Sequence, residues 1–302
     1  MPINSASPYG EVYTGANFQI SHYIESSYGA GTSLALANIG NLGVAEKVTT
    51  FQIDNQFEPL YNLGTREIAQ YYSKGWRVNV TVEFVMCGDQ KQWLNYVMAG
   101  NSGGTSTTWG VGNINSDAIV INTGEGTQYI VSGIVYTDAS ISITEGDVVK
   151  VTLSGAGQKF YKPAAAFTPS FTIPTDLYTY KDVTVESGIV KSFTLDIKNN
   201  PEQYYTLGAL DYQAYLPLKF EASGKWEVYH NSAASLLPST LPATVTSPAN
   251  IQTNISCVIG TDSNKYTFTA SNVVYNQSEM NVEPVQTVID TITYIAGDLT
   301  VS

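Results

Sequence analysis

The sequence predicts an all-β fold, mainly antiparallel, with one short helix and two tandem β-sandwich or barrel domains. Three observations support this prediction. Apolar and polar residues alternate along several segments, the composition is rich in Tyr, Thr, Ser, Asn and Gly, and one segment of the first half reappears in the second. Such alternation and composition are typical of strands joined by turns.

The clearest strand is predicted over residues 77–84. Apolar side chains occupy every second position, and polar or charged side chains occupy the positions between them. A period of two predicts a half-buried antiparallel strand. The apolar positions of this strand and of three others are Val78/Val80/Val82/Phe84, Ile141/Ile143, Val149/Val151/Leu153 and Tyr266/Phe268/Ala270.

One helix is predicted over residues 90–98, directly after that strand. Asp89 is a suitable N-cap with Gln92 three residues later, and Gly100 is a suitable end. Residues 231–238 predict a shorter turn at the equivalent place of the second half, and residues 101–128, rich in Gly, Ser, Thr and Asn, predict a loop insertion. The stripe expected to pack on the sheet is Trp93, Leu94, Val97 and Met98.

The chain matches itself at an offset of 144 residues, where residues 53–64 align with 197–208 without a gap. A second match, at offset 139, aligns residues 134–136 with 273–275. Two matches in the same order predict two copies of one domain, 1–162 and 163–302, joined by a Pro/Ala-rich linker near 162–169. The identical pairs are Ile53/Ile197, Asn55/Asn199, Glu58/Glu202, Tyr61/Tyr205, Leu63/Leu207 and Gly64/Gly208.

The charge balance argues against tight nucleic-acid binding. There are 14 Lys and Arg residues against 26 Asp and Glu, a net charge of −12, whereas phosphate binding needs a basic surface. Only 13% of residues are charged and 21 are Tyr, which suits surfaces that contact other copies of the chain. No long apolar run or basic leader is present, so neither a membrane span nor a secretory signal is expected.

The residues that usually carry catalysis or metal binding are scarce. His22 and His230 are the only histidines, and neither has a second His or Cys at ligand spacing. Cys87 and Cys257 lack the spacing of a redox or zinc motif, which favours buried, unreactive thiols. Short Gly-rich stretches do not continue into a nucleotide-binding pattern. We therefore expect no enzymatic activity, no cofactor and no metal site.

The repeated segment has a characteristic order. A strand ending in Ile-x-Asn leads through an acidic, Tyr-rich stretch into Leu-Gly, then a polar aromatic loop and a long alternating strand, over residues 51–84 and again over 193–229. This order resembles the major tail tube proteins of long-tailed phages and related viruses. The resemblance implies a sheet that joins those of its neighbours, six domains around a channel, and stacked rings. A duplicated chain would form a trimeric ring with pseudo-sixfold symmetry.

The resemblance also implies long loops that reach the adjacent subunit and ring, here residues 54–76 and 198–225. Solvent-exposed loops are rarely so aromatic. The aromatic side chains could instead fold back onto their own domain. Arg66 could pair with a carboxylate of a neighbour or stay solvated. The contact candidates are Phe57, Tyr61, Arg66, Tyr71, Tyr72, Trp76, Tyr204, Tyr205, Tyr212 and Tyr215.

The function implied is a self-assembling virion protein whose tube conducts viral DNA. A polar or acidic wall would let double-stranded DNA pass without tight binding, since a basic wall would hold its phosphates. Expected partners are the protein itself, the tape measure, the tail terminator and distal tail or baseplate proteins, with assembly in the host cytoplasm. Residues 1–16 would be an arm that orders on assembly. The lumen candidates are Thr81, Glu83, Thr152 and Ser154.

Two other interpretations fit the same sequence. A baseplate or surface β-sandwich protein could use the duplication to build a rigid rod, and ring closure separates it from a tube. A tandem carbohydrate-binding module could use the exposed Tyr and Trp side chains as sugar platforms. Glycan binding by a persistent monomer would support that module.

Overall fold

A computed structural model gives the fold. It describes residues 19–25, 27–29, 39–40, 42–64, 66–88, 90–98, 107–108, 114–122, 128–163, 176–185, 189–230, 251–261, 263–282 and 287–302. The predicted N-terminal arm, the Asp89 cap, the turn at 231–238 and most of the linker at 162–169 lie outside these residues.

Nearly all of the described structure is antiparallel β-sheet, as predicted. The elements of the first half are β1 (Gln19–Ile24), β2 (Ile39–Gly40), β3 (Val44–Tyr61), β4 (Ile68–Val85), α1 (Leu94–Val97), β5 (Thr107–Thr108), β6 (Asp117–Asn122), β7 (Gln128–Thr144), β8 (Lys150–Gly157) and β9 (Lys159–Tyr161). Those of the second half are the 3₁₀-helix η4 (Tyr180–Asp182), β10 (Val183–Val185), β11 (Ile189–Lys198), β12 (Pro201–Tyr204), β13 (Ala214–Pro217), β14 (Glu221–Tyr229), β15 (Ile251–Ile259), β16 (Tyr266–Asn281), β17 (Ile289–Ala296) and β18 (Asp298–Val301).

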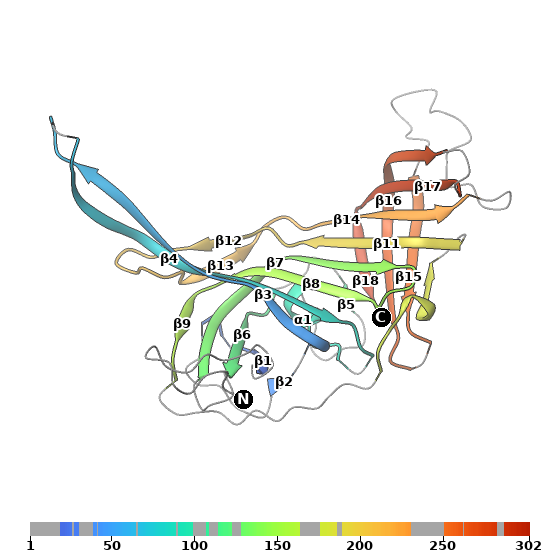
Figure 1. Cartoon of the computed structure of the whole chain (residues 1–302), viewed down its shortest axis with the longest axis horizontal. Helices are drawn as coiled ribbons and strands as arrows, with labels where there is room; N and C mark the ends of the chain where they lie inside the picture. The colour runs from blue at the N-terminus through green and yellow to red at the C-terminus, as the bar shows by residue number, and fades with distance from the viewer. Residues whose placement is uncertain are drawn as a thin grey trace, which may run out of the picture.

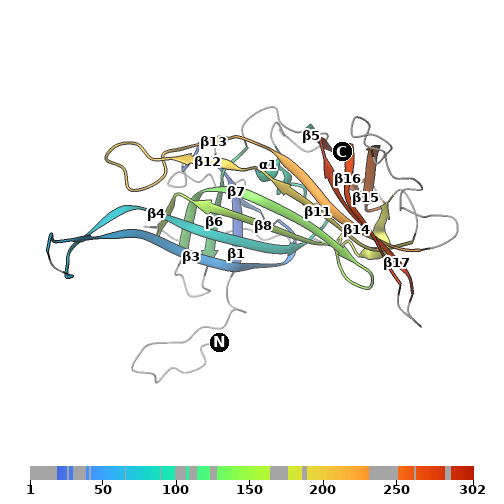
Figure 2. The ribbon, with the colours of Figure 1, turned by 90° about the horizontal axis from the view of Figure 1, so that it is seen from above.

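One sheet runs across both halves of the chain. Its central strands follow the order β3-β4-β8-β7-β11-β14-β17-β16, and each pairs antiparallel with the next. Figure 2 shows these strands side by side, from blue β3 at one edge to red β17 near the other. The contact between β7 and β11 therefore joins the first half to the second.

The two halves pair their strands in the same order, and residues 50–54 of β3 pair with β4 at the same offset as residues 194–198 of β11 pair with β14. Phe51 lies opposite Val80, and Leu195 lies opposite Gly224, 144 residues further along in both strands. An offset of 139 likewise relates the pairing of β7 with β8 to that of β16 with β17. In both pairs one residue bulges, Thr137 in β7 and Asn276 in β16. The sequence offsets are therefore also offsets of strand register.

The predicted alternation corresponds to one buried face of the sheet. Every apolar residue of the four predicted strands is buried, and the polar positions between those of β4 are half-buried. Trp93, at the end of the helical stripe, packs between Phe84 of the first half and Tyr266 of the second, with ring centroids 6.1 and 6.2 Å apart. The apolar core thus extends through both halves.

The helix is shorter than predicted. α1 has one turn, no side chain caps it, and extended backbone at Met98 ends it before the predicted stop. At its start, the Tyr266 hydroxyl is shared between the Cys87 carbonyl at 2.9 Å and the Gln90 carbonyl at 3.0 Å, and the Leu94 N–H donates to the Lys91 carbonyl at 3.2 Å. The Gln90 carbonyl, which would accept from the Leu94 N–H in a longer helix, therefore faces the buried Tyr266 hydroxyl. The predicted stripe is nevertheless fully buried.

The predicted loop over 101–128 is wrong in part. It contains β6, which pairs with β1 on one side and β7 on the other. The apolar run of Ala118, Ile119 and Val120 explains this strand, because all three side chains are buried in the described core.

Candidate assembly surfaces and channel face

The four lumen candidates lie together on the polar face of the central sheet. Thr81 is opposite Ser154, and Glu83 is opposite Thr152, across the β4–β8 pair. The hydroxyl oxygens of Thr81 and Ser154 are 3.2 Å apart. All four side chains are half-buried, whereas the alternate residues Val80 and Val82 are buried on the other face. The structure therefore brings these candidates together as one surface.

This polar face continues across the rest of the sheet. Ser140 of β7 donates to the Asp196 carboxylate of β11 at 2.6 Å, which carries the surface over the join between the halves. A shallow polar depression of about 320 Å³ marks its far end. That depression is lined by Lys225, Glu227, Gln277, Glu279, Thr291 and Thr293.

Two of the lysines on this face are held by carboxylates. Lys47 lies 2.8 Å from Glu83, and Lys225 lies 2.5 Å from Glu227. The hydrogen bond from Lys225 is the main reason that the pKa of Glu227 is lowered. At the edge toward the hairpin, Arg77 lies 3.4 Å from Asp54. Since these positive charges are neutralised locally, the face has mixed charge instead of a basic strip.

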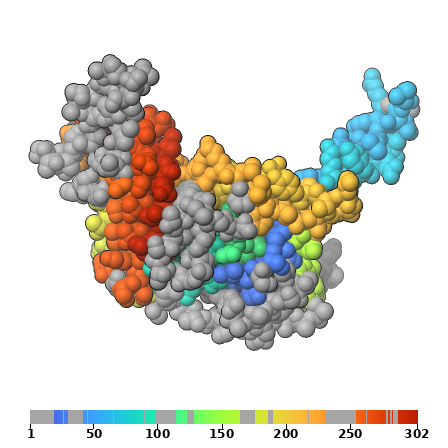
Figure 3. Space-filling view, turned by 180° about the vertical axis from the view of Figure 1, so that it is seen from behind, coloured from blue at the N-terminus to red at the C-terminus, as the bar shows by residue number. Residues whose placement is uncertain are grey.

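The first predicted loop, 54–76, is mostly a β-ribbon. β3 and β4 continue past the body of the sheet as a two-stranded arm, in which β3 ends at Tyr61 and β4 begins at Ile68. Figure 3 shows the arm standing clear of the molecule. Trp76, at its base, is half-buried and donates its backbone N–H to Leu210 at 2.9 Å. The candidates that are exposed along the arm are Phe57, Tyr61, Arg66, Tyr71 and Tyr72.

The second predicted loop, 198–225, contains a hairpin that is docked on the first half. Gln203 of β12 donates to the Ala156 carbonyl of β8 at 3.3 Å. Tyr215 packs edge-on against Tyr28, with centroids 5.1 Å apart, and its hydroxyl bonds to the Ile114 carbonyl. Tyr212 is buried and Tyr215 is half-buried, whereas Tyr204 and Tyr205 stay exposed. Here part of the aromatic set folds back onto the chain itself, in contrast to the free arm.

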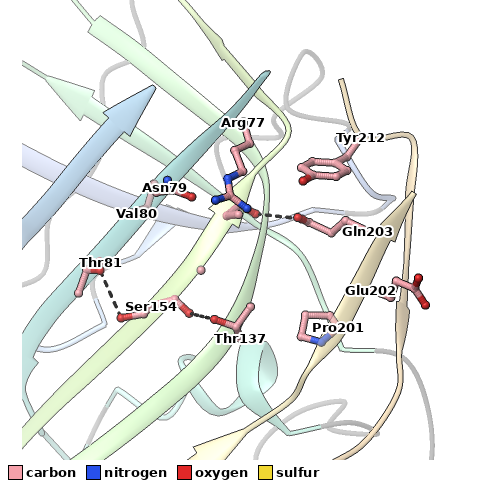
Figure 4. Close-up of a pocket in the computed structure, with 12 residues that line it drawn as sticks. Arg77, Asn79, Val80, Thr81, Thr137, Ser154, Pro201, Glu202, Gln203 and Tyr212 are labelled. Atoms are coloured by element: carbon pink, nitrogen blue, oxygen red, sulfur yellow. Dashed lines mark hydrogen bonds between the residues drawn. The ribbon is translucent and has the colours of Figure 1, made fainter. Parts of the chain in front are cut away.

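An open groove separates this docked hairpin from the central sheet. It has a volume of about 480 Å³. Figure 4 shows Arg77, Thr81 and Ser154 on the sheet side and Pro201, Gln203 and Tyr212 on the hairpin side. Its walls combine polar and apolar side chains, and its titratable lining residues are Arg77, Glu202 and Tyr212.

The tips of both hairpins carry a feature that sequence reasoning did not select. Leu63 and Leu207 are fully exposed. Each precedes a glycine with positive φ, +85° at Gly64 and +89° at Gly208, which a tight turn needs and which other residues rarely adopt. The signal was available, since both Leu-Gly pairs are identical in the repeat.

His22 belongs to a buried ion cluster. Its Nδ1 lies 2.6 Å from Asp117, and its Nε2 bonds to Glu46. Burial by itself would lower the pKa of His22, but the two carboxylates outweigh burial and raise that pKa to about 10. Tyr136 also donates to Asp117, at 2.7 Å. The charged imidazole thus ties β1 to β6 and to the start of β3, inside the fold and away from the surfaces above.

Nearby, burial raises the pKa of Glu25 to about 7. Cys87 and Cys257 are buried and form no disulfide, as predicted. Within the described ranges, no group of three or more His, Cys, Asp or Glu side chains has the arrangement of a metal site. No helix in the described part of the chain has the length and apolarity of a membrane span.

Comparison with known proteins identifies the family. No curated protein matches the chain. The sequence does match a family model described as "Phage tail tube protein", over residues 15–298, nearly its full length. An almost entirely antiparallel β fold with one short helix agrees with that match. The chain belongs to the phage tail tube protein family and is a structural component of the virion tail.

Proposed function

We propose that three copies of this chain close into a ring with pseudo-sixfold symmetry, and that stacked rings form a tube through which viral DNA passes. The observation that supports this most directly is the repeated strand order, with β3-β4-β8-β7 followed by β11-β14-β17-β16 at constant offsets. We read the repeat as an internal duplication, with one copy in residues 1–162 and the other in 163–302. Each chain then supplies two of six equivalent positions.

The polar face of the sheet is the proposed channel wall. Its opposite face is filled by the apolar core, so only the polar face can meet an aqueous lumen. Because Lys47 and Lys225 are paired with Glu83 and Glu227, their charges are less available to DNA phosphates. Double-stranded DNA, with one negative charge per about 1.7 Å of axis, would therefore slide past this wall without being held.

The arm and the docked hairpin are the proposed contacts between subunits and rings. Exposed aromatic side chains and the two tip leucines supply apolar surface that a solitary subunit leaves in water. A tube also needs proteins at its ends and inside it during assembly. We expect a tape measure, a tail terminator and a distal tail or baseplate protein as partners, with assembly in the host cytoplasm.

Negative-stain electron microscopy of the purified protein across a concentration series, beside mass measurement in solution, tests this function. Rings with the mass of three chains, or hollow tubes with threefold chain symmetry, are the expected result. Rods without a lumen would favour a non-tubular tail component. A monomer at every concentration, including after addition of preformed tube ends from virions, would refute self-assembly.

A further inference from the structure

The contact between β7 and β11 shows how one half of the chain receives the other. Seven residues of β11 pair with seven of β7, from Ser192 opposite Thr144 to Lys198 opposite Asp138. On the core side of this contact, Leu195 and Ile197 of β11 and Ile141 of β7 are buried. The junction is therefore a complete strand-to-strand interface within one chain.

The equivalent strands at the two ends of the sheet have no such partner among the described strands. β3 pairs only with β4, and residues 277–281 of β16 pair only with β17. β3 corresponds to β11 and β16 corresponds to β7 by the register offsets above. The two free edges are thus the two halves of a second junction, separated on opposite sides of one subunit.

The exposed side chains at these edges match the buried ones at the junction. Phe51 and Ile53 take the places of buried Leu195 and Ile197, and both are exposed. Across the sheet, Met280 takes the place of buried Ile141 and is also exposed. Val282, next on the same face, is 65% exposed. Apolar side chains that are buried at the β7–β11 junction are therefore exposed at each edge of the sheet. Exposed apolar side chains along an unpaired strand are typical of a surface that binds another protein chain.

A polar anchor follows the same rule. Asn199 is buried at the junction, where its backbone N–H donates to the Thr137 carbonyl at 2.7 Å and its side chain donates to the Tyr136 carbonyl at 3.2 Å. Asn55, its identical counterpart in the repeat, is exposed on β3. The bulge that receives Asn199 at Thr137 has its counterpart at Asn276 of β16. Asn55 is thus placed to enter the bulge of a neighbouring chain.

We propose that β3 of one chain pairs antiparallel with β16 of the next in the register of the β7–β11 junction. Gln52 then lies opposite Glu279, Phe51 opposite Met280, and Asn55 beside the bulge at Asn276. The occupant of each edge is a second copy of this chain, because the complementary edge is the other end of the same sheet. This inference rests on the proposed tube function and specifies the joint that closes its ring.

Disulfide trapping tests the register. Glu279→Cys is combined in turn with Thr50→Cys, Gln52→Cys or Asp54→Cys, all on the polar face of β3. Directly opposed residues have Cα atoms about 4.5–5.5 Å apart, within disulfide reach, and each two-residue step adds roughly 6.6 Å along the strand. Positions 52 and 279 of one subunit are seven strand spacings apart, about 34 Å, so any link joins two chains. The wild-type protein, whose two cysteines are buried, is the control for background disulfide formation.

The proposal expects the 52/279 pair to link at least several-fold more efficiently than 50/279 or 54/279, with covalent species ending at three chains. Strongest linking at 50 or 54 in intact rings would overturn the register, and rings without any link would overturn the joint, while the tube function would stand in both cases. Absence of rings and tubes from the wild-type protein, with no links in any variant, would instead refute the proposed function.

A matched pair of substitutions gives an independent test. Ile53→Glu lies in the proposed joint, and Ile68→Glu lies on the arm outside it, at nearly equal exposure of 41% and 42%. Both variant proteins should keep the wild-type unfolding midpoint, because neither side chain is in the core. Only Ile53→Glu should abolish the three-chain species in a mass measurement. Equal loss in both variants, or in neither, would contradict the proposed joint.

Discussion

Removing the leucines at the two hairpin tips should uncouple ring stacking from ring formation. Leu63 and Leu207 are fully exposed in the subunit, so replacing both by alanine removes no intramolecular packing. The proposed joint between neighbours lies on β3 and β16, away from the tips. If the tips instead contact the adjacent ring, their apolar surface is buried only when rings stack.

The size of the effect follows from apolar burial. Covering a leucine side chain that was in water contributes about 2 kcal/mol. A ring of three chains has three copies of each tip, so Leu63→Ala alone should cost about 6 kcal/mol per ring contact if all three tips are covered. That free energy corresponds to about four powers of ten in the stacking equilibrium constant. The double variant, with Leu207→Ala, should lose more.

The assay measures the protein concentration above which tubes form, by sedimentation and electron microscopy, together with the mass of the smallest closed species. Asn62→Ala with Thr206→Ala is the matched control, because it alters the same turns without removing apolar surface. The leucine variants should give rings and few tubes, whereas the control should behave as wild type. Tubes at the wild-type concentration in the double leucine variant would refute the role of the tips, and a lowered unfolding midpoint would show that the side chains act within the subunit.

Three further results are expected. Trp93→Ala should lower the unfolding free energy by roughly 3–5 kcal/mol in denaturant titrations, since this ring is fully buried between the halves; a change below 1 kcal/mol would contradict that packing. Because His22 has a folded pKa of about 10 against 6.5, its stabilisation is complete below about pH 6.5 and is lost as pH rises toward 10; His22→Gln should flatten the stability profile over that window, and an unchanged slope would exclude His22 as its source. Glu83→Gln with Glu227→Gln should release their lysine partners and give assembled tubes a salt-sensitive affinity for DNA, whereas DNA passing unretained through variant and wild-type tubes alike would argue against a lumenal position.

The strands of the body could be read from the sequence because burial imposes a period. In β4, Val78 to Phe84 alternate since one face meets the core and the other meets water. The arm formed by the distal parts of β3 and β4 could not be predicted from such alternation. Neither face of the ribbon near Tyr61 or Tyr71 is buried in the subunit, so no alternation marks it, and its aromatic residues suggested a loop.

Other features depend on contacts that no local pattern contains. β6 was hidden by the Gly- and Ser-rich composition of its surroundings, although its own core is a short apolar run. The edge residues Phe51 and Met280 acquire meaning only when the strand order shows which edges lack a partner. The pairing of His22 with Asp117 joins residues far apart in sequence, and nothing in their spacing predicts it.

The β7–β11 contact has a consequence for the kinetics of assembly. In a ring of three chains with six equivalent joints, three joints already exist when each chain has folded, because they are covalently tethered. The proposed ring therefore forms in two associations between chains, since the third joint closes within the assembled trimer, and each association forfeits translational and rotational freedom worth about 4–15 kcal/mol. A ring of six single-domain chains would need about five such associations. The continuous polypeptide through β7 and β11 therefore makes ring closure a lower-order reaction, which favours completed rings over partial arcs at low subunit concentration.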